Sequence, residues 1–321
     1  MQNSRYYALS AYLKTRYGKR VRKVPLDAGS SCPNRDGAAS KSGCVFCNSK
    51  GTGTGLHERG MSLAQQWSFL TDRIGRKYKT DCFWAYLQSF TNTYGPLARV
   101  RALMRELAVL PDMRLVSLGT RPDCLDKEKL RCIADWGIPE IWLDIGLQSS
   151  NDLTLRRINR GHDFACFAHC VEEVRAQGLH VCVHVVHGLP GETSADFLRT
   201  IRDVSRLPVS GIKFHNLFVA SGSTLEDWWR KGAFVPGEMD EYVQAVGESL
   251  NFLRPDIIVH RLNADPGPGE LLAPQWAADK TRVLNAIQRH LEVMNCRQGS
   301  QCRETNPHRR KGTFSTGTSH E

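Results

Sequence analysis

At 321 residues, with 41% hydrophobic and 24% charged side chains, the chain has the composition of a soluble globular protein and the length for one barrel-sized domain or two smaller ones. No apolar run approaches the length of a membrane span and the N-terminus lacks the apolar stretch of a secretory signal, so the sequence excludes a membrane partner and predicts a cytoplasmic protein. The net charge of +10 is compatible with an anionic partner.

Taken in chain order, short apolar strands alternate with longer amphipathic segments. We expect strands over residues 21–27, 82–88, 114–118, 140–146, 180–186 and 211–217. We expect helices over residues 5–18, 62–77, 97–109, 126–135, 151–157, 163–177 and 193–205. Strands that are each followed by a helix indicate βαβ units and a parallel sheet. The predicted fold class is α/β, a partial (β/α)6 barrel with its working face at the carboxyl ends of the strands. An open doubly wound sheet ranks second, because no G-x-G-x-x-G motif follows a strand.

The pattern changes beyond residue 235. Two long helices, expected over residues 237–253 and 270–293, flank a short strand over 256–261 and are expected to close the open barrel. The predicted division of the chain is a basic N-terminal helix over 1–20, the barrel over 21–235, an α-rich extension over 236–296 and a basic disordered tail over 297–321.

Positive charge gathers at the two ends of the chain. Residues 1–28 carry seven Lys and Arg residues against one Asp, and residues 297–321 carry five against two acidic residues. Four tyrosines are interleaved with the N-terminal charges: Tyr6, Tyr7, Tyr12 and Tyr17. This pattern suits a polyanion with bases that can stack. It equally suits an amphipathic first helix with solvated charges and tyrosines turned into the core, and both interpretations stay open.

Three cysteines share one Gly- and Ser-rich loop after the first strand. Cys32, Cys44 and Cys47 are spaced C-x11-C-x2-C. A C-x2-C pair directs two thiolates to one metal-sized centre, and the loop can return to supply a third. Three protein ligands leave one iron of a four-iron cluster without a protein ligand, and an open coordination position is where chemistry can occur. A structural zinc site with His57 as fourth ligand is the alternative.

The other eight cysteines are expected to be small core residues or incidental thiols. Cys166 and Cys170 could form a second metal site with His162 and His169 on one helix, although buried packing is the interpretation that we favour. Core positions are expected for Cys82, Cys124, Cys132 and Cys182, and incidental thiols for Cys296 and Cys302. Eleven cysteines without an export signal indicate a reducing compartment.

Several motifs together resemble one family. They are Cys32–Gly37 with Gly43–Cys47, Phe90–Tyr94, Gly146–Ser149, Ile158–His162 and His187–Glu192. In these motifs the chain resembles the radical S-adenosylmethionine (SAM) superfamily. Within it, the chain resembles the bacterial YhcC/YtqA group, which is related to the radical-SAM domain of the Elongator catalytic subunit. The resemblance spans roughly residues 5–293.

The resemblance implies a radical SAM enzyme whose cofactors are a [4Fe–4S] cluster and SAM. Cys32, Cys44 and Cys47 would be the catalytic metal ligands, and SAM would chelate the fourth iron and be cleaved to methionine and a 5′-deoxyadenosyl radical. The implied SAM-binding residues are Thr91, Asn92, Thr93, Gln148, Arg160, His184 and Gly188. For Gln148 and Arg160, hydrogen bonding at the barrel rim and helix capping is the alternative. An electron donor such as flavodoxin or ferredoxin is an implied partner.

Candidate substrate residues are expected at two strand ends: His215, Asn216, His260 and Arg261. Bonds that tie the C-terminal helices to the barrel are the equal alternative. The kinship to Elongator and the basic N-terminus favour tRNA modification at the C5 side chain of a wobble uridine, with room for a partner modification enzyme. A radical SAM enzyme for a small-molecule or cofactor substrate ranks second, and a non-catalytic metal-containing RNA-binding module third.

Overall fold

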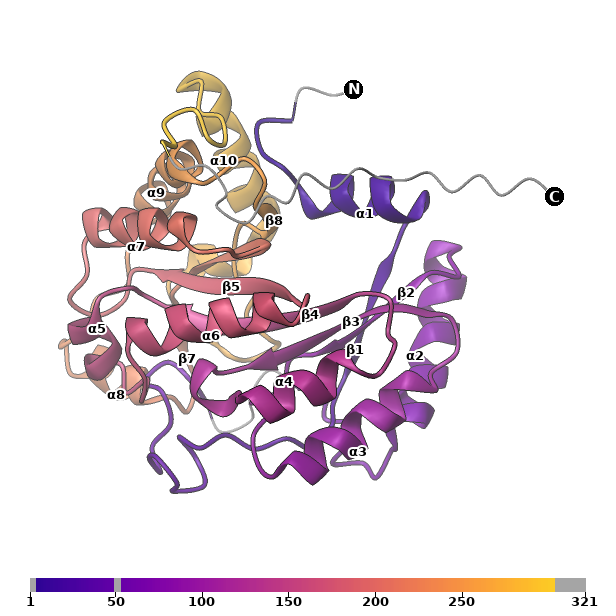
Figure 1. Ribbon diagram of the computed structural model, residues 1–321. Helices are drawn as coiled ribbons and strands as arrows, with labels where there is room; N and C mark the ends of the chain where they lie inside the picture. The colour runs from indigo at the N-terminus through magenta and orange to yellow at the C-terminus, as the bar shows by residue number, and fades with distance from the viewer. Residues whose placement is uncertain (1–3, 49–52, 304–321) are drawn as a thin grey trace.

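The computed structural model describes residues 4–48 and 53–303. Its centre is a curled seven-stranded sheet in the order β1-β2-β3-β4-β5-β6-β8, in which every neighbouring pair is parallel. The strands are β1 (Arg22–Leu26), β2 (Phe83–Leu87), β3 (Met113–Thr120), β4 (Ile141–Gln148), β5 (His180–His187), β6 (Gly211–Asn216) and β8 (Ile258–Arg261). Because β1 and β8 do not pair with each other, the sheet is a half-barrel (Figure 1). The predicted partial barrel is confirmed, and the short strand near 256–261 joins it as a seventh strand.

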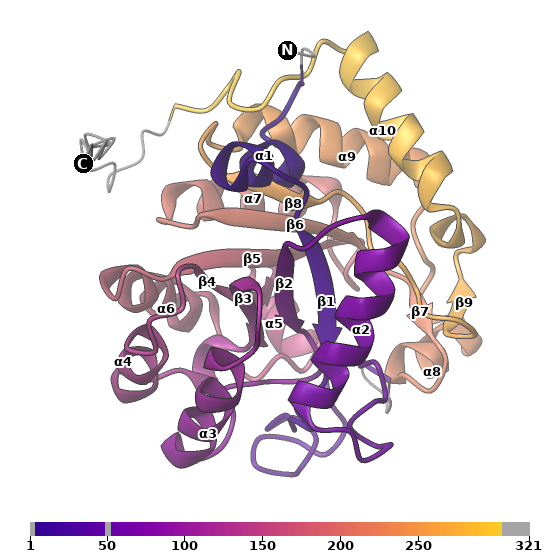
Figure 2. The same ribbon diagram turned by 90° about the vertical axis from the view of Figure 1, so that its right-hand side faces the viewer.

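Helices cover the outer face of this sheet (Figure 2). They are α2 (Leu63–Tyr78), α3 (Leu97–Ala108), α4 (Lys127–Ala134), α6 (Phe164–Ala176), α7 (Ser194–Arg206) and α9 (Met239–Phe252), with α10 (Lys280–Val293) against α9. Two short helices, α5 (Asp152–Arg157) and α8 (Thr224–Arg230), lie at the opposite end of the sheet from α1 (Leu9–Tyr17) (Figure 1). None of the helices in the described residues is both long and apolar enough to cross a membrane.

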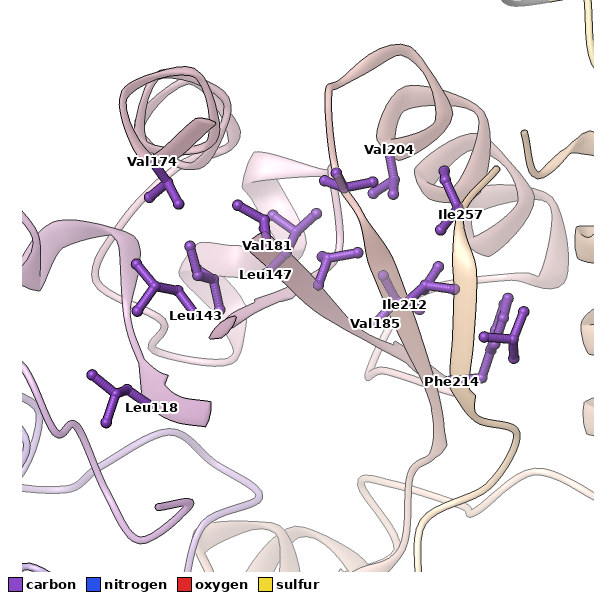
Figure 3. Close-up of a cluster of buried hydrophobic side chains, with 14 of the residues drawn as sticks. Leu118, Leu143, Leu147, Val174, Val181, Val185, Val204, Ile212, Phe214 and Ile257 are labelled. Atoms are coloured by element: carbon purple, nitrogen blue, oxygen red, sulfur yellow. The ribbon is translucent and has the colours of Figure 1, made fainter. Parts of the chain in front are cut away.

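The strands alternate between an apolar outer face and a polar inner face. Outward residues such as Leu143, Val181 and Ile212 pack with helix residues such as Val174 and Val204 in one continuous core (Figure 3). Neighbouring positions on β4, β5 and β6 carry Asp144, His184 and Lys213. Because successive side chains of a strand point to opposite faces, this alternation places the hydrophobic core outside the half-barrel and charged groups inside it.

Helix α1 closes the amino-terminal end of the half-barrel. Leu13 is 7% exposed and packs with Trp84 and Trp142, and the Tyr12 ring meets Trp142 edge-on at 6.0 Å between centroids. Tyr7 and Tyr17 pack against the same cluster, and Tyr6 packs against the main core. The structure therefore favours the interpretation in which the N-terminal tyrosines, all half-buried, face the core.

Two predicted helices begin later than expected. The helix predicted over 5–18 begins at Leu9, because Ala8 forms a parallel bridge with Val259 and so stays extended. The helix predicted over 270–293 begins only at Lys280, after the Asp279 carboxylate accepts a hydrogen bond from the backbone amide of Arg282.

The residues before that helix form other elements. Strand β9 (Leu271–Ala273) pairs antiparallel with β7 (Val219–Ala220), and a short 3-10 helix (Gln275–Ala278) follows Pro274. Proline lacks the N–H that an α-helix interior needs, which explains why no α-helix runs through this segment.

Residues 297–303, predicted as part of the disordered tail, form turns that contact the body of the protein. The Gln298 side chain donates hydrogen bonds to the carbonyls of Arg254 and Ile257, each at 2.8 Å, and accepts one from the amide of Tyr7 at 2.7 Å. The rest of the predicted tail lies outside the described residues.

The contact of α1 with the barrel yields a stability prediction. Leu13→Ala removes buried methyl groups and should lower the free energy of unfolding by about 2–4 kcal/mol, measured by urea denaturation. Lys14→Ala, at the adjacent exposed position of the same helix, is the matched control and should change it by less than about 0.5 kcal/mol. Equal effects of the two substitutions would contradict the role of α1 as a packed closure.

Candidate active site

The three loop cysteines line one cavity at the carboxyl ends of the strands. The cavity has a volume of about 270 Å³ and is also lined by strand-end residues that include Gln88, Gly119, Gly146, Gln148, Val186 and His215. Cys44 is buried, Cys32 is half-buried and Cys47 is exposed. The carboxyl ends of the strands are where enzymes with barrel folds carry their active sites.

Hydrogen bonds anchor the cysteine loop to the turn after α5. The Asn34 side chain donates to the carbonyl of Asn159 at 2.6 Å and to Cys44 Sγ at 3.5 Å. Asn159, with φ 54°, returns a hydrogen bond from its own side chain to the carbonyl of Gly43 at 2.6 Å. Asparagine tolerates this left-handed backbone conformation, so the turn can present its amide to the loop. These bonds fix the position of Cys44.

Arg160 connects the loop to the sheet. Its Nη1 donates to Cys44 Sγ at 3.5 Å, and its Nη2 donates to the carbonyl of Gly146 at 2.6 Å. A Cβ atom at residue 146 would lie 2.5 Å from Nη2, so only glycine leaves room for the guanidinium there. The Nε of Arg160 is buried and has no hydrogen-bond partner among the described residues.

A second guanidinium lies near the same thiol. Arg121 is 2% exposed and pairs with both oxygens of Asp123, at 2.9 and 2.7 Å, while its Nη1 lacks a partner in the described part of the chain. A hydrogen bond with Cys47, together with the charges of Arg160 and Arg121, holds the pKa of Cys44 well below its usual value. The site therefore favours a thiolate, which is the form of cysteine that binds metals.

The structure brings together four of the seven residues that the resemblance implies for SAM. Thr91, Gln148, Arg160 and His184 line the cavity with the cysteines. Gln148 has φ +79° and lies where the register of β4 against β5 shifts. A positive φ is uncommon in residues other than glycine, and such residues are often found at functional sites.

The other three lie elsewhere. The Asn92 side chain donates to the carbonyls of Leu87 and Gly119, each at 3.0 Å, and Thr93 Oγ1 donates to the carbonyl of Cys124 at 3.0 Å. These bonds shape the turn that carries Thr91. Gly188 lines a separate groove of about 950 Å³ beside α7 and α9.

The four candidate substrate residues do not lie together. His215 and Asn216 line the cavity, and Asn216 Oδ1 also accepts a hydrogen bond from the amide of Ala264 at 2.8 Å. His260 lies at the opposite end, where its ring centroid is 4.7 Å from that of Trp142 and 5.9 Å from that of Trp84. Arg261 is half-buried and pairs in register with Lys213. Burial of His215, and next the charge of Arg261, hold the pKa of His215 well below its usual value.

Sequence reasoning missed a charged network inside the half-barrel. Lys213 Nζ donates to Asp144 Oδ2 and, at 2.7 Å, to the hydroxyl of Tyr86. The side chains of Lys213 and Asp144 are each 1% exposed. The Lys23 ammonium lies 4.2 Å from the ring centroid of Trp84 and 4.6 Å from that of Tyr86.

Charged residues in the middle of apolar strands were the signal that could have revealed this network. Arg121, directly after β3, was also missed.

The geometry does not support the two alternative metal sites considered from the sequence, a zinc site with His57 and a second site on the helix of Cys166 and Cys170. His57 lies directly over Gly29 and lines a different cavity from the cysteines. Cys170 belongs to the main core, whereas His169 on the same helix is exposed.

Among the described residues, the ligand atoms of Asp144, Cys182 and His184 do lie within 4.8 Å of one another. Lys213 already occupies Asp144 there, so a metal ion would have to displace an ammonium group.

Comparison with known families decides the membership of this chain. Residues 32–204 match the model of the Radical SAM superfamily, and residues 209–293 match the Radical_SAM C-terminal domain. The chain belongs to the radical SAM superfamily. This radical SAM protein is accordingly an enzyme, and its cofactors are a [4Fe–4S] cluster and SAM. The family resemblance seen in its motifs is confirmed.

The chain is also similar to individual proteins in sequence and in structure. YtqA of Bacillus subtilis is 37% identical over 297 residues, which cover 92% of each chain. A tRNA uridine(34) acetyltransferase of Dehalococcoides mccartyi is 26% identical over 203 residues, which cover 62% of this chain and 43% of that one. The structure of Elp3 of the archaeon Methanocaldococcus infernus, with an N-terminal deletion, superposes with a TM-score of 0.67 at 15% identity, over 87% of this chain and 64% of that one. At this identity the likeness supports the fold alone.

The buried pair of Lys213 and Asp144 yields a prediction for urea unfolding. Lys213→Met leaves a buried carboxylate without its cation and should lower the free energy of unfolding by about 3–5 kcal/mol. The double variant Asp144→Asn/Lys213→Met removes both charges and should recover much of that loss. If the single and double variants unfolded at the same urea concentration, the two charges would not be coupled.

Proposed function

We propose that Cys32, Cys44 and Cys47 ligate the [4Fe–4S] cluster and that the cavity they line binds SAM. The observation that carries this proposal is the convergence of three thiols and two buried guanidinium groups on one strand-end cavity. The guanidinium groups of Arg160 and Arg121 fit a cluster because they offset the charge of its thiolate ligands. When bound, the cluster and SAM supply an electron transfer that cleaves SAM and starts radical chemistry on a substrate.

The residues around the thiols have separate tasks in this proposal. Buried N–H groups of Arg160 and Arg121 without partners among the described residues are donors for the carboxylate of SAM, which a guanidinium binds well. Thr91, Gln148 and His184 supply further polar contacts to SAM. Asn92 and Thr93 act indirectly, because their hydrogen bonds hold the turn that carries Thr91.

We further propose that the substrate is tRNA, modified at the C5 side chain of a wobble uridine. The similarity to a tRNA uridine(34) acetyltransferase over 203 residues supports this assignment, and a net charge of +10 suits a polyanion. The N-terminal tyrosines no longer support it, since they pack against the barrel. A small-molecule substrate is the second candidate, because the cavity floor reaches the enclosed polar interior at Asp144 and His215.

Two expectations about the cell belong to the same proposal. The enzyme takes its electron from a donor such as flavodoxin or ferredoxin. All eleven cysteines lie within the described residues and none forms a disulfide, which suits the reducing cytoplasm.

The cluster assignment is tested by iron analysis. After anaerobic reconstitution, the wild-type protein should bind about four irons per chain, as a [4Fe–4S] cluster requires. Cys32→Ser, Cys44→Ser and Cys47→Ser should each lose most of this iron. Cys166→Ser, at a half-buried cysteine on α6, is the matched control and should keep it. Stoichiometric zinc in place of iron, or full iron content in all three variants, would refute the assignment.

The substrate assignment is tested by a mass-spectrometric nucleoside profile of total tRNA. A strain that lacks the gene should lose one modified wobble uridine and accumulate its precursor. The wild-type gene should restore the nucleoside, whereas the Cys44→Ser gene should not. A profile that is unchanged over several growth conditions would count against tRNA and leave the cluster assignment untouched.

A further inference from the structure

We propose that the interior of the half-barrel, beneath the cysteine cavity, is an anion site that receives a carboxylate or phosphate group of the substrate. The site is formed by inward-facing residues of six strands, which we call the lumen cluster: Lys23, Tyr86, Asp144, His184, Lys213, His215 and Arg261. The inference does not depend on tRNA being the substrate.

The lumen cluster carries more positive than negative charge. It contains three basic side chains, on β1, β6 and β8, and one carboxylate, that of Asp144. Lys213 lies against that carboxylate and forms a buried ion pair with it. Within residues 4–48 and 53–303, no acidic side chain forms an ion pair with Lys23 or Arg261. Two cations of the cluster therefore lack an ion pair of their own among these residues.

Lys23 and Arg261 are both half-buried, so water solvates their charges only in part. The Lys23 ammonium contacts the rings of Trp84 and Tyr86, and the Lys213 ammonium lies 4.7 Å from the same Tyr86 ring. Burial, and next the charge of Lys213, lowers the pKa of Lys23 to about 7. A bound anion would remove this repulsion and restore the charge of Lys23. Groups with strongly perturbed pKa values cluster at functional sites.

The cavity that holds the cysteines offers a route of entry for the anion. Three members of the lumen cluster, Asp144, His184 and His215, line that cavity, and Lys213 lies directly behind them through its ion pair with Asp144. The opposite end is filled by Trp84, Trp142 and the packed side chains of α1. A group that enters by this route belongs to a molecule whose remaining part lies beside Cys32, Cys44 and Cys47.

Two histidines complete the site. The rings of His184 and His215 stack with their centroids 5.2 Å apart. The Nε2 atom of each is buried without a hydrogen-bond partner in the described chain, and that of His184 lies 3.8 Å from Asp144 Oδ2. Burial, with the charge of Lys213 next, lowers the pKa of His184 to about 4, so the imidazole is neutral near pH 7. A neutral imidazole can donate one N–H to an oxygen of a carboxylate or phosphate.

A metal ion is a poorer occupant of the same space. Asp144, Cys182 and His184 form a compact set of ligand atoms, but Lys213 is bound to Asp144 and the surrounding charge is positive. A divalent cation would be repelled by the groups that attract an anion.

Isothermal titration calorimetry with two probe anions tests the proposal. The protein, reconstituted with its cluster and free of SAM, is titrated with inorganic phosphate and, separately, with malonate, at constant ionic strength in chloride. We expect saturable binding of at least one probe at one site per chain. Lys23→Met and Arg261→Gln should each weaken that binding at least tenfold. Lys127→Met, at an exposed lysine on α4, is the matched control and should leave it unchanged.

The titrations with phosphate and with malonate identify the ligand class, and the variants decide whether the lumen cluster binds the probe. Binding of phosphate alone indicates a phosphate group, and binding of malonate alone indicates a carboxylate. Lys23→Arg and Arg261→Lys, which keep the charge, should retain binding and guard against loss by misfolding. The proposal would be overturned if neither probe bound saturably, or if Lys23→Met and Arg261→Gln bound the probe as tightly as the wild-type protein does. Iron content and tRNA profiles are separate readouts, so failure here is distinguishable from failure of the proposed function.

Discussion

The buried ion pair between Lys213 and Asp144 is the interaction on which the interior of this half-barrel depends. It joins β6 to β4 across β5 and, through the hydroxyl of Tyr86, reaches β2 as well. Most barrels fill their interior with branched apolar side chains, whereas this one holds charged groups there. A buried carboxylate is tolerated only when it is paired, and Lys213 provides that pairing. Because Asp144 is thereby neutralised, the remaining cations of the interior act on whatever enters from the cavity.

A second dependence links the cysteine loop to this scaffold. Arg160 contacts Cys44 with one nitrogen and the carbonyl of Gly146 on β4 with another. The loop itself has no regular secondary structure, so its thiols take their positions from bonds to Asn159, Arg160 and the turn that contains them. Reactive groups on loops work when a rigid framework holds them. Here the framework is the carboxyl end of the sheet, and the same edge carries Gln148, His184 and His215.

Much of the fold was predictable because its signals are local. Apolar strands followed by amphipathic helices repeat along the chain, and each pair indicates a βαβ unit without knowledge of distant residues. The same holds for the spacing of Cys32, Cys44 and Cys47 in one loop, and for the strand-end positions of Gln148 and His215. The errors lie where a distant contact overrides the local pattern. Ala8 stays extended because it pairs with Val259, and the segment 271–273 is a strand because it pairs with β7.

The sequence by itself determined the α/β class, the order of the elements and the cysteine loop, because periodicity and spacing are properties of neighbouring residues. Only the tertiary structure decided which charged residues meet. Lys213 and Asp144 are 69 residues apart, and Lys23 approaches both only when β1 curls round with the sheet. It also decided that the N-terminal tyrosines face Trp84 and Trp142, and that His260 lies at the closed end while Arg121 faces the thiols. A strand that is buried on both faces does not indicate from its own sequence which face is the interior, and the curl of the sheet supplies that information.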